Sequence, residues 1–149
     1  MTDRQIRVAL VCVQNAGRSQ MATAFAERER DRRSLDSVEI RTGGTDPADS
    51  VHDVVVQAMG EIGIDISDRR PQAITTDELA ACDYVATMGC STLDLAGDTD
   101  GFDPDDVDVR DWALPDPHGQ DIETVRDIRG QVEASVVGLF DEIEAQVDD

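Results

Sequence analysis

The stretch Val11-Cys12-Val13-Gln14-Asn15-Ala16-Gly17-Arg18-Ser19 decides the expected fold. A mostly apolar run at residues 6–11 leads into it, and apolar residues follow it at helical spacing: Met21, Ala22, Phe25 and Ala26. This pattern predicts a buried strand at residues 6–12, a short loop, and a helix at about residues 18–33. Such a loop can point several backbone N–H groups at one place, where the helix N-terminus adds positive potential.

The side chains of this loop favour an oxyanion site with a sulfur nucleophile. Arg18 can donate two parallel hydrogen bonds to an oxyanion, and Cys12 lies where the loop dipoles favour a thiolate. The alternative, a buried structural cysteine beside a surface arginine, puts Arg18 against the helix dipole with no anion to hold. Ser19 can donate to the sulfur, cap the helix, or do both. The predicted substrate-binding residues are Val13, Gln14, Asn15, Ala16, Gly17, Arg18 and Ser19.

The rest of the chain alternates strand and helix patterns. Further strands are predicted at residues 38–42, 84–89 and 107–112, and further helices at residues 51–60, 76–81 and 121–146. This order indicates one α/β domain at residues 1–149: a three-layer sandwich around a four-stranded parallel sheet. Ligands of such sheets bind beyond the carboxyl ends of the strands, where Cys12 is expected.

Two helix faces can be assigned from their apolar spacing. The helix predicted at residues 51–60 has an inner face of Val54, Val55, Ala58, Met59 and Ile62, and Gly63 is expected to stop it. The last helix should bury Ile122, Val125, Ile128, Val132, Val136, Leu139, Phe140 and Ile143.

The charge of the chain is strongly one-sided. Its 33 acidic residues face 13 basic residues, all of them arginine, for a net charge of −20. This composition is typical of a halophile that keeps molar salt inside the cell, and the regular periodicity argues against a disordered acidic protein. It also argues against nucleic acid and anionic membranes as partners. No signal peptide or membrane-spanning stretch is visible, so a cytoplasmic location is expected.

The two histidines, His52 and His118, lack the spacing of a metal site, so no metal is expected. The three cysteines favour catalytic or redox thiols over structural disulfides.

The cysteine loop resembles the phosphate loop of the low-molecular-weight protein tyrosine phosphatases and of the arsenate reductases that share their fold. Gln20-Met21-Ala22 continues the resemblance and favours the reductase branch, because the phosphatases usually have proline after the serine. Matches follow in the family's order: residues 42–44 (TGG), 63–67 (GIDIS), 84–88 (YVATM) and 116–119 (DPHG).

The resemblance implies roles for residues outside the loop. Asp116 would be the general acid that protonates the leaving oxygen. Cys90, after a strand on the same sheet edge, would be the thiol that attacks Cys12. Reductases coupled to thioredoxin have a third cysteine several residues later, and residues 91–111 contain none. Cys82 is no substitute, because it precedes its strand and so lies about 20 Å from the active edge; it is expected to be a small buried residue.

Two functions remain open. An arsenate reductase would use nucleophilic Cys12, acid Asp116 and a resolving thiol, either Cys90 or an external one, with no bound cofactor and a thioredoxin-like or small-thiol reductant. A low-molecular-weight phosphatase would hydrolyse a phosphomonoester, or a phosphoprotein partner, through a thiophosphate on Cys12. His118-Gly119, in place of the phosphatases' aromatic residues after Asp-Pro, favours the reductase; the missing third cysteine favours the phosphatase.

Overall fold

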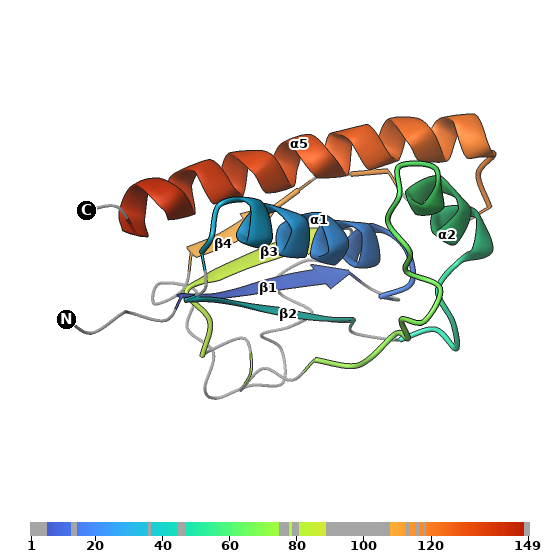
Figure 1. Ribbon diagram of the computed structural model, residues 1–149. Coiled ribbons are helices and arrows are strands. Elements are labelled where there is room, and N and C mark those ends of the chain that lie inside the picture. The colour runs from blue at the N-terminus through green and yellow to red at the C-terminus, as the bar shows by residue number, and fades with distance from the viewer. Residues whose placement is uncertain are drawn as a thin grey trace.

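A four-stranded parallel sheet forms the centre of the molecule (Figure 1). The computed structural model describes residues 6–12, 15–35, 37–44, 47–74, 78, 81–88, 108–112, 114–115, 117 and 119–147. The strands are β1 (Ile6–Cys12), β2 (Val38–Gly44), β3 (Tyr84–Met88) and β4 (Asp108–Asp111), in the order β2-β1-β3-β4. The predicted α/β class is therefore confirmed, and β1 has the bounds that the sequence predicts.

The central strand β1 is buried on both faces. Val8, Leu10 and Cys12 join the main core cluster, while Ala9 and Val11, which point to the opposite face, are fully buried as well. A parallel strand covered on both sides reads as a continuous apolar run, which explains the composition of this segment. Its register pairs Cys12 with Gly44 of β2 and with Met88 of β3, so all three strands end at the same edge.

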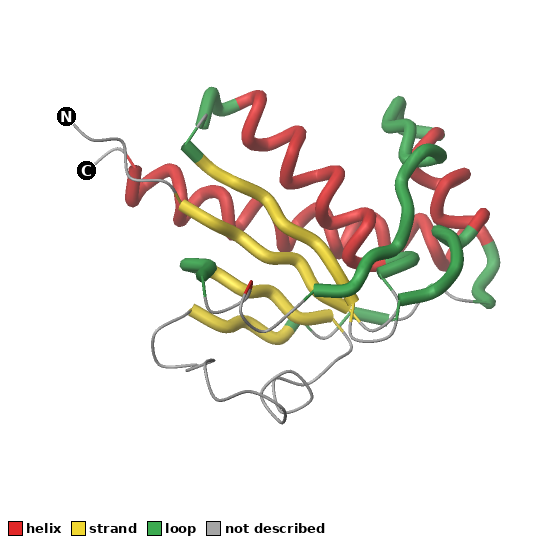
Figure 2. Tube along the Cα trace, turned by 90° about the horizontal axis from the view of Figure 1, so that it is seen from below, coloured by secondary structure: helices red, strands yellow, loops and turns green. Residues whose placement is uncertain are grey.

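Two long helices cover one face of the sheet. They are α1 (Arg18–Arg32) and α5 (Ile122–Val147), and in the view from below the strands lie in front of both (Figure 2). The apolar spacing predicted for the last helix is confirmed, with Ile122 half-buried and the other predicted positions fully buried. Of the helix expected at residues 76–81, only residues 78 and 81 are described. No helix in the described part of the chain has the length and apolar character needed to cross a bilayer.

The short helix α2 (Asp53–Gly60) corrects one prediction. Val55, Ala58 and Met59 are buried as expected, but Ile62 is 40% exposed. The helix ends at Gly60, and Gly63 adopts a left-handed φ of +82° in the turn that follows. Helical spacing therefore no longer decides which way residue 62 points.

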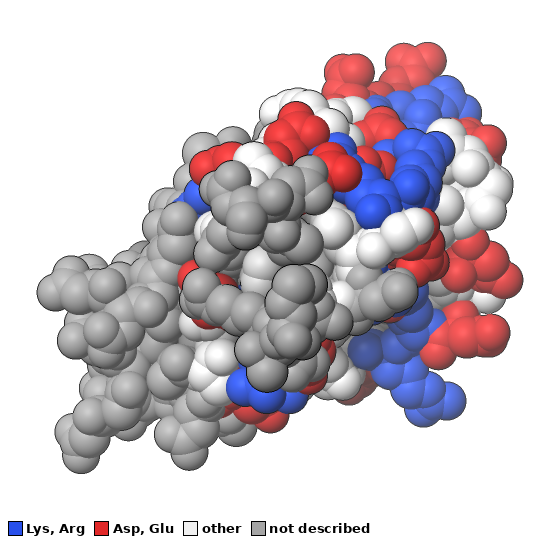
Figure 3. All heavy atoms as spheres, turned by 60° about the vertical axis from the view of Figure 1, so that its left-hand side comes forward, with Lys and Arg blue, Asp and Glu red and all other residues white. Residues whose placement is uncertain are grey.

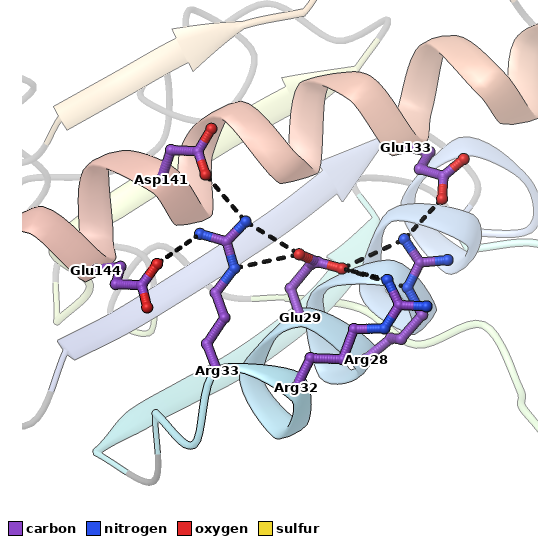
Figure 4. Close-up of polar contacts among 7 residues, drawn as sticks. All are labelled: Arg28, Glu29, Arg32, Arg33, Glu133, Asp141 and Glu144. Atoms are coloured by element: carbon purple, nitrogen blue, oxygen red, sulfur yellow. Dashed lines mark hydrogen bonds and ion pairs between the residues drawn. The ribbon is translucent and has the colours of Figure 1, made fainter.

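An ion-pair network joins α1 to α5 (Figure 4). At its centre is Glu29, only 4% exposed, whose carboxylate accepts hydrogen bonds from three arginines of the same helix segment: Arg28, Arg32 and Arg33. Two of these arginines also reach carboxylates of α5: Glu133, Asp141 and Glu144. Burial opposes the charge on Arg33, but its bonds to Asp141 and Glu29 outweigh that effect and raise its pKa.

Arginines lie among carboxylates on the surface as well. In the space-filling view the described arginines are interspersed with acidic side chains (Figure 3). Arg126 and Arg129 of α5 both bind Glu61 after α2, and the hydrogen bond from Arg126 is the main cause that lowers the pKa of Glu61 to about 2. A chain with many more carboxylates than arginines thus uses its few cations to join elements.

Candidate active site

The candidate nucleophile lies at the carboxyl end of the central strand. Cys12 is the last residue of β1 and is 2% exposed, and α1 begins at Arg18. Between them the structure describes Asn15, Ala16 and Gly17, all buried, while Val13 and Gln14 lie outside the described residues. The strand–loop–helix arrangement predicted from the sequence is therefore present.

The sulfur of Cys12 sits among hydrogen-bond donors. The backbone N–H of Asn15 donates to Sγ at 3.1 Å, and Ser19 Oγ lies 2.8 Å from Sγ. Ser19 Oγ accepts a hydrogen bond from Asn15 Nδ2 at 2.7 Å, so its own proton is available for the sulfur. Two donors aimed at one sulfur stabilise negative charge on it, as a nucleophilic thiolate requires.

Asn15 holds the loop through a buried network. Its φ is +51°, a left-handed conformation that asparagine tolerates better than most residues. Its Nδ2 also donates to Thr42 Oγ1 at 2.8 Å, and its Oδ1 accepts from Gln20 Nε2 and from the Gln72 backbone N–H, both at 3.0 Å. These contacts tie the backbone and side chain of Asn15 to Ser19, Thr42, Gln20 and Gln72, so they order the loop. Nothing in the sequence marks Gln72 as a partner, since it lies 57 positions away.

The N-terminal turn of α1, next to the cysteine loop, carries no anionic side chain. It has no acidic residue, and its N-cap, Gly17, offers no side-chain cap. The helix dipole and the free N–H groups of such an end favour an anion. Arg18, the first helical residue, donates from Nη1 to the Leu114 carbonyl at 2.9 Å. The guanidinium is thereby anchored to the segment that follows β4.

That segment also touches Gly17. A Cβ placed on Gly17 would come within 2.7 Å of Cγ of Pro117, which is buried. The residue before Pro117 in the sequence is Asp116, the candidate acid, which lies outside the described residues, as do Cys90 and His118. Leu114 and Pro117, which are described, lie beside the cysteine loop.

Cys82 lies where the sequence places it, at the amino end of β3. It is buried, its thiol donates to the Glu78 carbonyl at 3.2 Å, and burial raises its pKa to about 11. Cys12 pairs with Met88 at the other end of the strand, about 20 Å away at the usual rise per residue. A protonated, buried thiol at that distance has no access to the sulfur of Cys12. The described residues contain no group of three potential metal ligands.

Comparison with known proteins decides the family. The sequence matches the low molecular weight phosphotyrosine protein phosphatase family over residues 7–149. The chain belongs to this family. Its members are enzymes, and relatives of this chain are named arsenate reductases.

Two relatives in sequence carry reductase names. A Halobacterium salinarum protein with the provisional name arsenate reductase is 62% identical over 141 residues, 94% of each chain. The glutaredoxin arsenate reductase of Synechocystis is 32% identical over 92% of this chain and 98% of its own.

Solved structures of both branches share the fold. The thioredoxin-dependent arsenate reductase of Corynebacterium glutamicum superposes with a TM-score of 0.75 at 32% identity, covering 98% of this chain and 65% of that one. An arginine phosphatase superposes with a TM-score of 0.82 at 20% identity, covering 93% of this chain and 96% of its own, and shows the fold alone.

Proposed function

We propose that this protein reduces arsenate to arsenite, with Cys12 as the nucleophile. The observation that carries the proposal is the placement of the Cys12 sulfur, which has Asn15 N–H and Ser19 Oγ within hydrogen-bond distance at the N-terminus of α1. Relatives at 62% and 32% identity over nearly the whole chain, the first with a provisional arsenate reductase name and the second named a glutaredoxin arsenate reductase, support the choice of substrate.

The first step is a displacement at arsenic. Arsenate binds in the loop of residues 13–19, where the backbone N–H groups and Arg18 hold its oxygens. Cys12 Sγ attacks arsenic and forms a sulfur–arsenic bond, while the bond to one arsenate oxygen breaks. That oxygen leaves as water after taking a proton from Asp116, since hydroxide is otherwise a poor leaving group.

The second step transfers the electrons. Another thiol attacks the Cys12 sulfur and forms a disulfide, so the two thiols lose two electrons and arsenic leaves as arsenite. We assign this thiol to Cys90 or to an external thiol, because Cys82 is buried at the far end of β3. A thioredoxin-like protein or a small thiol then reduces the disulfide, and no bound cofactor is required.

A phosphatase is the second candidate. The observation in its favour is the cysteine inventory: of three cysteines, Cys82 is remote from the loop, and no further cysteine follows Cys90 to carry a disulfide outward. In that case Cys12 would form a thiophosphate intermediate, Asp116 would protonate the leaving alcohol or phenol, and water would complete hydrolysis.

Counting thiols after one turnover distinguishes these functions. Fully reduced protein in molar KCl is given arsenate without added thiol. Loss of two thiols, with mass mapping to a Cys12–Cys90 disulfide, supports an internal relay. Loss of none, followed by arsenite release on addition of a small thiol, supports an external donor. If no thiol is lost and no arsenite is released with or without the small thiol, and the protein hydrolyses an aryl phosphate, the reductase proposal is refuted in favour of the phosphatase.

A further inference from the structure

Gly17 lies where three segments meet. On one side is Pro117, whose Cγ would be 2.7 Å from a Cβ at position 17; on another is His52, whose ring Cδ2 would be 3.5 Å from it. The His52 backbone N–H donates to the carbonyl of Ala16 at 3.0 Å, so the start of α2 is tied to the same loop. The space beside the Gly17 Cα is therefore filled by the proline ring.

A second contact also holds the segment after β4 against the loop. It is the hydrogen bond from Arg18 Nη1 to the Leu114 carbonyl at 2.9 Å. Together they attach residues 114 and 117, on either side of Asp116, to adjacent residues of the oxyanion loop. Pro117 is buried, and its ring is closed on the backbone and fixes its φ, so beyond a change of ring pucker it can move away only together with its backbone.

We propose that Gly17 is a positioning residue whose missing side chain provides the seat for Pro117, and that this contact sets the reach of Asp116 toward the bound oxyanion. The inference rests on the proposed acid role of Asp116. Relieving a 2.7 Å approach requires Cγ of Pro117 to retreat by about 1 Å to reach ordinary carbon–carbon contact, and the buried backbone of Pro117 has to take up what ring pucker does not. The neighbouring residue is covalently tied to that displacement, and a misplacement of about 1 Å can cost about 100-fold in rate.

The proposal predicts which kinetic parameter changes. Oxyanion binding uses Arg18 and the loop N–H groups, including that of residue 17, which alanine retains, whereas protonation of the leaving oxygen needs the segment of residues 114–117. Gly17→Ala should therefore lower kcat for arsenate reduction by about 10- to 100-fold, while KM for arsenate and Ki for inorganic phosphate change by less than about threefold. A general loss of structure would instead raise KM and Ki together.

A double-mutant cycle on the full chain tests the contact itself. Pro117→Ala removes the clashing Cγ, so Gly17→Ala/Pro117→Ala should recover at least about tenfold in kcat over Gly17→Ala alone. The matched control is Gly130→Ala, because a Cβ at that position in α5 meets nothing within 4 Å. The control should keep wild-type kcat, KM and phosphate Ki, and far-UV circular dichroism should show all variants folded.

Several results would overturn the inference. One is an unchanged kcat in Gly17→Ala; another is a double variant no faster than Gly17→Ala; a third is a loss of phosphate binding that accounts for the whole rate loss. Asp116→Asn separates the two proposals, because full activity in that variant removes the acid role, while non-additivity between positions 17 and 117 still tests the contact.

If the enzyme hydrolyses aryl phosphates and does not reduce arsenate, Gly17→Ala should slow the hydrolysis of phenyl phosphate far more than that of nitrophenyl phosphate. An equal loss of rate on both substrates would refute the positioning role of Gly17.

Discussion

Replacing Glu29 by glutamine removes the charge at the centre of the α1–α5 network and keeps the shape of the side chain. Glu29 is 4% exposed, and its carboxylate receives guanidinium nitrogens of Arg28, Arg32 and Arg33 at 3.1 to 3.4 Å. The amide retains one acceptor oxygen and presents an NH₂ group to the remaining donors. The three arginines then lie around a buried position that no longer carries a compensating charge.

The cost follows from these contacts. Removing one partner of a buried ion pair typically costs about 3 to 5 kcal/mol. Arg28 and Arg33 keep partners on α5, so we expect a loss of about 2 to 4 kcal/mol in the free energy of unfolding. For a chain of this size, that loss lowers Tm by about 5 to 15 °C.

Urea unfolding followed by far-UV circular dichroism measures this loss, since urea leaves the ionic strength unchanged. The matched control is Glu144→Gln, because that side chain is 41% exposed and bonds only Arg33 within the network; it should cost at most about 1 kcal/mol. Added KCl should shrink the effect at Glu144 more than the effect at Glu29, since buried charges are screened less. The reasoning is refuted if Glu29→Gln unfolds at the same urea concentration as Glu144→Gln.

Three further predictions concern the cysteines and the strand edge. Cys12→Ser should abolish turnover, whereas Cys82→Ser should stay within about twofold of wild type, and inactivity of a folded Cys82→Ser would contradict the assigned geometry. Burial raises the pKa of Cys82 from 9.0 to about 11, so its stabilising contribution is fully present below pH 9 and is lost as the pH rises to about 11. Unfolding free energies from pH 8 to 11 should show this slope, and Cys82→Ala should lack it. Gly43→Ala would place a Cβ 2.4 Å from Cβ of Ile74 and should cost about 1 to 3 kcal/mol; an unchanged urea midpoint would contradict this.

The elements with strong local signals were predictable. The bounds of β1 match the expected range because its apolar run is continuous, and the inward face of α5 matches because apolar residues recur at helical spacing over the whole helix. Ile62 shows where the same reasoning stops, since spacing carries no information beyond the last helical residue, Gly60.

Some contacts of the candidate site could be predicted from the sequence and others could not. Cys12, Asn15 and Ser19 lie within one loop and the turn after it, so their proximity follows from local sequence. Thr42 reaches the loop because the register of β1 and β2 pairs Leu10 with Thr42, and Gln72 arrives through a bridge between Ala73 and Gly44. Neither partner has a local signal, since strand pairing joins residues that are distant in the chain.

The burial of Glu29 could not be predicted from the sequence either. Charged runs such as residues 27–33 ordinarily indicate a solvated helix face. Here α5 packs along α1 and brings carboxylates toward Arg28 and Arg33, so Glu29 ends up enclosed by arginines (Figure 4).

By itself, the sequence determined the order of strands and helices, the cysteine loop and its expected oxyanion chemistry, because apolar period and loop composition act over short distances. Only the tertiary structure decided what surrounds that loop: Thr42 and Gln72 on Asn15, the Leu114 carbonyl on Arg18, and the Pro117 ring on Gly17. Those contacts depend on strand register and on close packing between distant segments, where a single Cβ decides whether two segments can meet.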